Sequence, residues 1–152
     1  MIGKFLSSFF FRNTVSEDLI SRKKIDDYLE RLNIKPIKVI EEEKYLTYVI
    51  KVELDFGEIE LDIRFKIETP RWVEFKTIFL EDLEPSVEVY EKILELNYAT
   101  VLTRFGIENK TVYAKIELPF PTLDYEEFFS AIKRIANDVN NYYPLFNETT
   151  HQ

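Results

Sequence analysis

The chain has 152 residues, with 20 basic and 28 acidic side chains, a single histidine, no cysteine and three glycines. Without cysteine it can form no disulfide, thiol nucleophile or cysteine-ligated zinc site. The single histidine is His151 of 152 residues, a position that argues against a Ser-His-Asp relay, and a metal site of several histidines within one chain is excluded. The net charge of −8 argues against binding to nucleic acid or to an anionic membrane, because both depend on lysine and arginine. The composition therefore favours binding over catalysis, with no cofactor and no metal.

The start of the chain, residues 1–13, is an apolar segment that is too short to span a bilayer and has no small-residue cleavage site. Wound as a helix, it places one set of apolar side chains on a single stripe: Ile2, Phe5, Leu6, Phe9 and Phe10. We expect this stripe to pack on its own domain or on a twin subunit, with a peripheral membrane anchor or docking helix as the alternative. We expect the protein to be cytoplasmic.

A helix is predicted from about Val15 to Leu32. A capping box at residues 14–17 marks its start, because a hydroxyl and a carboxylate at this spacing satisfy free N–H groups of the first turn. Pro36 marks its end, because the residue before a proline avoids the helical conformation.

Strands follow this helix. After a short run at 37–40, apolar and polar side chains alternate strictly from 46 to 67, with Gly57 at the turn. This pattern predicts an antiparallel hairpin with one buried face and one solvent-exposed face. Another strand is predicted at 71–80, with a second side that is only partly polar.

The second half of the chain predicts a helix, a hairpin and a helix. Pro85 fits the first turn of the helix, whose apolar face we assign to Val87, Tyr90, Leu94 and Asn97. The hairpin is predicted at 99–105 and 111–118. Residues 124–127 predict another capping box, formed by Asp124 and Glu127, at the start of a long helix that Pro144 is expected to end.

The expected fold is an α+β two-layer sandwich, in which helices pack on one face of an antiparallel sheet in the order α-β-β-β-α-β-β-α. Strict alternation argues against a doubly wound parallel sheet, because the strands of such a sheet are apolar on both faces. We predict an N-terminal apolar segment (1–13), a single domain (14–146) and a flexible tail (147–152).

Several passages resemble a known family. They are Ile-Leu-Glu-Leu-Asn at 93–97, the strand and proline at 112–119, the acidic helix start at 123–128 and Tyr-Tyr-Pro at 142–144. The chain resembles the YbjN-like family and, at the level of the fold, class I type III secretion chaperones of the Tir-chaperone type. The resemblance implies a module without catalytic residues, commonly dimeric, that acts by protein association. Such chaperones wrap an extended segment of a client around their surface.

Carboxylates are the only plentiful reactive groups. Three of them share one face of a strand at a spacing of about 7 Å, which could bridge a hard cation: Glu58, Glu60 and Asp62. Cations are expected on the same face at Lys51, Arg64 and Lys66. We interpret this face as a salt-bridged surface in contact with water and assign no catalytic or metal-binding residue.

Apolar side chains give the better candidates. Trp72, Ile78 and Leu80 are predicted on the otherwise polar side of their strand, where they would either bind a partner or be covered by a loop, the N-terminal segment or a second subunit. An uncovered edge strand, 71–80 or 111–118, could also pair with a client strand.

The sequence therefore predicts a homodimeric, non-catalytic protein-binding or chaperone-like module with a protein client. Its candidate partner-binding residues are Trp72, Ile78, Leu80, Ile2, Phe5 and Phe9. One alternative is a regulatory domain that senses a small ligand in a pocket lined by aromatic side chains. The other is a carboxylate-dependent hydrolase or metal-binding enzyme, which requires acidic side chains to converge in a concave pocket.

Overall fold

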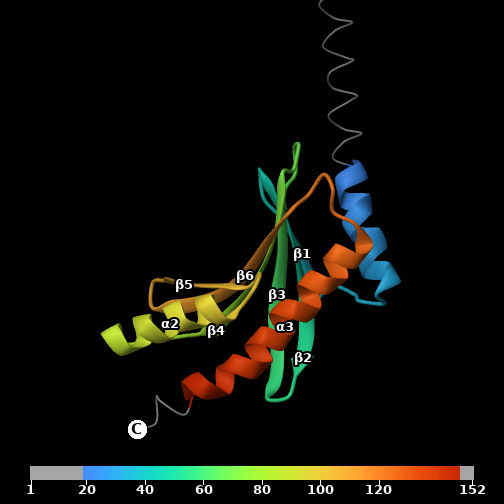
Figure 1. Cartoon of the computed structure of the whole chain (residues 1–152). Coiled ribbons are helices and arrows are strands. Elements are labelled where there is room, and N and C mark those ends of the chain that lie inside the picture. The colour runs from blue at the N-terminus through green and yellow to red at the C-terminus, as the bar shows by residue number, and fades with distance from the viewer. Residues whose placement is uncertain (1–18, 148–152) are drawn as a thin grey trace, which may run out of the picture.

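The computed structural model describes residues 19–147 (Figure 1). Residues 19–31 are helical. The elements that follow are β1 (Lys38–Glu41), β2 (Tyr45–Leu54), β3 (Gly57–Lys66), β4 (Trp72–Leu80), α2 (Val87–Ala99), β5 (Arg104–Glu108), β6 (Thr111–Pro119) and α3 (Tyr125–Asn147). This is an α+β fold, as predicted, with β1 as an additional short strand.

The strands form one antiparallel sheet in the order β1-β2-β3-β4-β6-β5. The three helices cover the same face of this sheet, with α3 across its middle strands and α2 over β5 (Figure 1). The core lies between these layers and contains the fully buried side chains of Phe65, Phe75, Phe128 and Ile135. The opposite face of the sheet is covered by no other element among residues 19–147.

The hairpin of β2 and β3 has its apolar face towards the helices, as predicted, but Thr47 and Val49 on the face predicted to be exposed are also buried. Gly57 lies at the end of this hairpin with φ of +147°, a backbone conformation that side chains with a Cβ rarely adopt. Asn140 on α3 holds the tip, because its side chain accepts from the Asp55 N–H (2.8 Å) and donates to the Asp55 carboxylate (2.9 Å). The long hairpin is thereby fixed to the helix layer.

The predicted end of the last helix is wrong. Pro144 lies inside α3, which continues to Asn147. A proline in this position removes one helical hydrogen bond. The last turn compensates by burying Phe146, whose ring packs edge-on against Phe79 at 5.4 Å between centroids. The other boundaries proposed for the N-terminal segment and the tail concern residues 1–18 and 148–152, which lie outside the described part of the chain.

The predicted apolar face of α2 is also wrong. Ile93 and Leu96 are buried, whereas Val87 and Leu94 are exposed. The rotation of the helix is set by Asn97, whose side chain donates to the Phe105 carbonyl (2.9 Å) and accepts from the Phe105 N–H (2.7 Å). This pair of hydrogen bonds ties the end of α2 to β5 and selects the face that packs inward.

Substitution Asn97→Ala is expected to lower the free energy of unfolding by about 2 kcal/mol, because it leaves the N–H and the carbonyl of Phe105 without their hydrogen-bond partner. Urea unfolding followed by circular dichroism measures the loss. Asn141→Ala is the matched control, since Asn141 is exposed on α3, and it should change stability by less than about 0.5 kcal/mol. Equal effects in the two variants would contradict this role of Asn97.

Candidate functional site

An exposed apolar stripe runs along α2 and the loop after it. Its members are apolar side chains that point away from the core: Val87, Tyr90, Leu94, Tyr98, Val101 and Leu102. Leu94 is 68% exposed and Tyr98 is 95% exposed. The opposite side of α2 packs on the core through Val89, Ile93 and Leu96. We call the exposed set the α2 stripe.

A helix that is apolar on both sides is normally buried on both sides. Within residues 19–147 only one side of α2 is covered, so the α2 stripe is the strongest candidate for contact with another protein. Sequence reasoning missed it because it took Val87, Tyr90 and Leu94 as the packing face of the helix and assigned no role to the apolar side chains that follow. The signal was present, since apolar residues occupy a wide arc of this helix and leave one sector to Glu88, Glu91, Lys92 and Glu95.

The structure separates the side chains that were expected to form one patch on β4. Trp72 and Ile78 lie on the open face of the sheet, 59% and 46% exposed. They are six residues apart, which is about 20 Å along a strand. Leu80 packs against the core, because the register between β4 and β6 shifts between Ile78 and Leu80. The candidates Ile2, Phe5 and Phe9 lie outside the described residues.

The strands expected at the sheet edge are central. The strands at 71–80 and 111–118 are β4 and β6, which pair with each other, while β1 and β5 form the edges. Helix α2 carries the chain past β4 to β5, and the following turn brings β6 back beside β4. Of the two true edges, β1 carries exposed apolar side chains at Val39 and Ile40.

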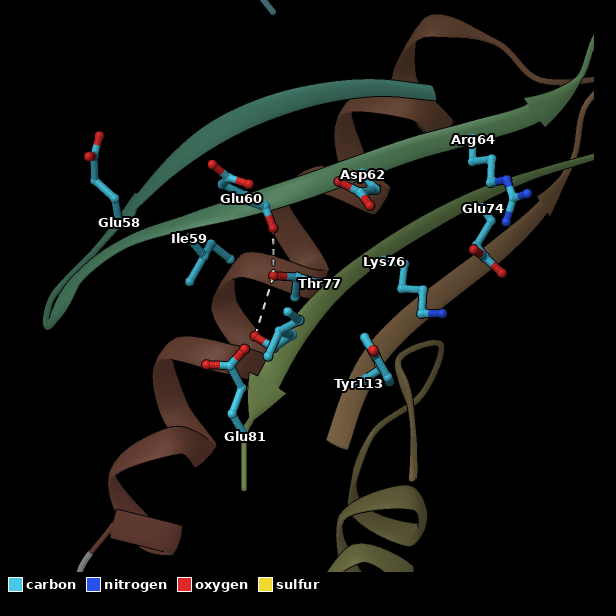
Figure 2. Close-up of a pocket in the computed structure, with 11 residues that line it drawn as sticks. Glu58, Ile59, Glu60, Asp62, Arg64, Glu74, Lys76, Thr77, Glu81 and Tyr113 are labelled. Carbon is cyan, nitrogen blue, oxygen red and sulfur yellow. Dashed lines mark hydrogen bonds between the residues drawn. The ribbon is translucent and has the colours of Figure 1, made fainter. Parts of the chain in front are cut away.

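Strands β3 and β4 separate over part of their length. Their ladder extends from Phe65↔Val73 to Asp62↔Lys76, and the two strands diverge beyond it. Thr77 lies at this point, where its buried hydroxyl donates to the Glu60 carbonyl at 2.8 Å (Figure 2). We call this gap, bordered by Ile59, Ile78 and Glu81, the β3–β4 opening.

On the open face of the sheet, the opening forms an acidic groove of about 520 Å³. Figure 2 shows Glu58, Glu60 and Asp62 along β3, with Lys76 and Tyr113 on the other side of the groove. On the helix side, the same opening borders an apolar cleft of about 720 Å³ whose aromatic lining consists of Phe56, Phe79 and Tyr143. Both hollows are open to solvent and share the three border residues.

The carboxylates of the groove differ in how they are neutralised. Glu58 pairs with Lys51 at 3.4 Å and Glu74 pairs with Lys115 at 3.5 Å. Among the described residues, no cation lies within 4.0 Å of the carboxylates of Glu60, Asp62 and Glu81.

Partial burial raises the pKa of Asp62 above its usual value of 3.8, and the neighbouring Glu60 carboxylate raises it further, while Lys38 and Lys76 oppose the shift. The acidic side chains therefore converge in a groove. Even so, no group of three acidic or histidine side chains within residues 19–147 is arranged to hold a metal ion. The groove therefore presents a negatively charged surface to the solvent.

Substitution Asp62→Asn is expected to raise stability at neutral pH by less than about 1 kcal/mol after solvent screening. Because the folded pKa is raised, the stabilising contribution of Asp62 is complete below pH 3.8 and is lost as the pH rises through the folded value. Above that range the wild type keeps a partly buried charge that asparagine removes. The free energy of unfolding, measured with urea at several pH values, should fall less with rising pH above 3.8 in the variant than in the wild type. The same pH dependence in both proteins would contradict the raised pKa of Asp62.

Comparisons with known proteins give the class of fold. By sequence, the chain matches none of the known family models and none of the curated proteins. By structure, it is similar to a chain of the HopA1–SchA chaperone–effector complex, with a TM-score of 0.57 and 8% identity over 84% of this chain and 95% of the other. It is also similar to YbjN from E. coli, a candidate transcription regulator, with a TM-score of 0.52 and 11% identity over 79% and 89% of the two chains.

The chain therefore has a YbjN-like fold, which a type III secretion chaperone complex shares, and the resemblance inferred from the sequence is confirmed at the level of the fold. None of the helices in the described part of the chain is long and apolar enough to cross a bilayer.

Proposed function

We propose that this protein is a non-catalytic binding module that forms a homodimer through the α2 stripe and holds a segment of a client protein. The α2 stripe carries the proposal. Its residues would be exposed on a lone subunit, and a second copy offers the same apolar surface at equal concentration in a self-complementary, two-fold arrangement. Interfaces between identical subunits are also more apolar than transient ones.

The client is supported by the comparison with a chaperone–effector complex, in which a related fold acts by binding another protein. The similarity to YbjN leaves a regulatory use of the same binding role open. A small-ligand sensor is less well supported, because such ligands are mostly enclosed by their pocket and both hollows at the β3–β4 opening are open to solvent.

Sedimentation equilibrium of the full chain tests the proposal. We expect twice the mass of the chain at micromolar concentrations and dissociation only on strong dilution. A monomer throughout this range would contradict the dimer. Affinity capture from the native lysate then tests the client: the wild type should enrich one protein reproducibly, and capture of none at high bait loading would contradict a client-binding role.

A further inference from the structure

We infer that the β3–β4 opening binds an extended segment of a partner protein in which lysine or arginine alternates with large apolar side chains. The inference rests on the proposed protein-binding function and specifies the chemistry of the client segment. Three features of the opening support it: unpaired charge, an adjoining apolar cleft and strand edges without ladder partners.

The charge of the opening selects a cationic partner. Glu60, Asp62 and Glu81 have no ion-pair partner among the described residues, and Asp62 is partly buried beside Glu60. The cations that line the groove are Arg64 and Lys76, and each lies over an aromatic ring, of Tyr45 and Tyr113 respectively. A lysine or arginine from outside would therefore meet carboxylates that form no ion pair within the described residues.

The apolar cleft selects a partner that also carries large apolar side chains. Phe56, which stacks on Tyr143 at 4.3 Å between centroids, and Ile78 are both partly exposed at its mouth. Because Ile59, Ile78 and Glu81 border both hollows, a bound segment would have apolar and acidic surfaces within reach at the same place. Successive side chains of an extended segment point to opposite sides. A partner in which cationic and apolar residues alternate would therefore direct its cations to the acidic groove and its apolar side chains to the cleft.

The strand edges favour an extended partner over a helical one. Strand β3 continues to Gly57 and β4 to Leu80, but their ladder stops at Asp62↔Lys76. Beyond it, the Thr77 hydroxyl donates a hydrogen bond across to the Glu60 carbonyl. Backbone groups of β3 that face the gap can pair with an added strand, which is a common mode of peptide recognition.

Isothermal titration calorimetry of the full chain tests the inference with two short synthetic peptides. One alternates lysine with valine and phenylalanine, and the other carries glutamate in place of each lysine. We expect the lysine peptide to bind at least about tenfold more tightly than the glutamate peptide. Its affinity should fall as salt rises from about 50 to about 500 mM, because the charges are partly exposed.

Two variants locate the site. Glu60→Gln with Asp62→Asn is expected to weaken the lysine peptide about tenfold, and Ile78→Thr about threefold through lost apolar contact. The matched control, Glu30→Gln with Asp27→Asn, removes the same charge from exposed positions on the N-terminal helix. It should keep the affinity within about twofold of the wild type, since these charges are distant and screened.

Equal affinity for the two peptides, wild-type affinity in the groove variant, or an equal loss in the control would each overturn the inference. If neither peptide binds while the chain is dimeric and captures a client, this inference is wrong and the proposed function stands. A monomeric chain that captures no client contradicts the proposed function itself, whatever the peptides do.

Discussion

Replacing both Leu94 and Tyr98 with lysine is expected to weaken self-association at least about 100-fold and to leave a folded monomer. Both side chains are largely exposed in a single subunit, so their loss should cost the monomer less than about 0.5 kcal/mol each. In a two-fold interface, each substitution acts twice and places a lysine in an apolar contact without a partner charge. Large side chains at the centre of an interface contribute most of its binding energy.

Sedimentation velocity measures the change, and circular dichroism confirms the fold. Leu19→Lys with Ile20→Lys is a close control, because these side chains are 62% and 65% exposed on the N-terminal helix and receive the same added charge. The control should remain dimeric. Persistence of the dimer in the stripe variant, or dissociation of the control to the same extent, would show that the α2 stripe is not the interface.

Phe128→Ala is expected to lower the free energy of unfolding by about 4 kcal/mol. Phe128 is fully buried on α3, and its ring contacts Phe75 on β4 at 5.6 Å and Tyr28 on the N-terminal helix at 5.4 Å. It therefore joins two helices to the sheet. A loss of this size is a large part of the roughly 5–15 kcal/mol that stabilises an ordinary domain.

Urea unfolding at a constant protein concentration measures this loss. The neighbouring residue provides the comparison, because Phe129 is only partly buried and packs on Tyr125 at 6.3 Å. Phe129→Ala should cost less than about 1.5 kcal/mol. If both truncations cost the same, the side of α3 that packs on the sheet has been assigned incorrectly.

The local features of the fold could be predicted where a short stretch of sequence contains both partners. The last helix begins with the predicted capping box, in which Glu127 N–H donates to the Asp124 carboxylate (2.8 Å) and Asp124 N–H donates to the Glu127 carboxylate (3.1 Å). Ser86 caps α2 by accepting from the Val89 N–H, so the helix begins after Pro85, and the prediction that Pro85 lies in its first turn is wrong. The alternation around Gly57 likewise predicted the β2–β3 hairpin and its buried face.

Other features depend on partners far away in the sequence. The buried side of α2 depends on Asn97 meeting Phe105, and the continuation of α3 past Pro144 depends on Phe146 meeting Phe79. The candidate surfaces were harder still to predict. The alternation of β3 continues unchanged through Glu58 and Glu60, so nothing in it indicates that β4 diverges from β3 there.

The sequence alone determined which segments become helices and strands and which side of the first hairpin is apolar, because turns, caps and periodic patterns act between residues that are close along the chain. Only the tertiary structure decided that β4 and β6 are central, that one apolar side of α2 is left exposed and that β3 and β4 diverge. These outcomes follow from the competition among all apolar surfaces for one shared core, and no short stretch of the chain contains that information.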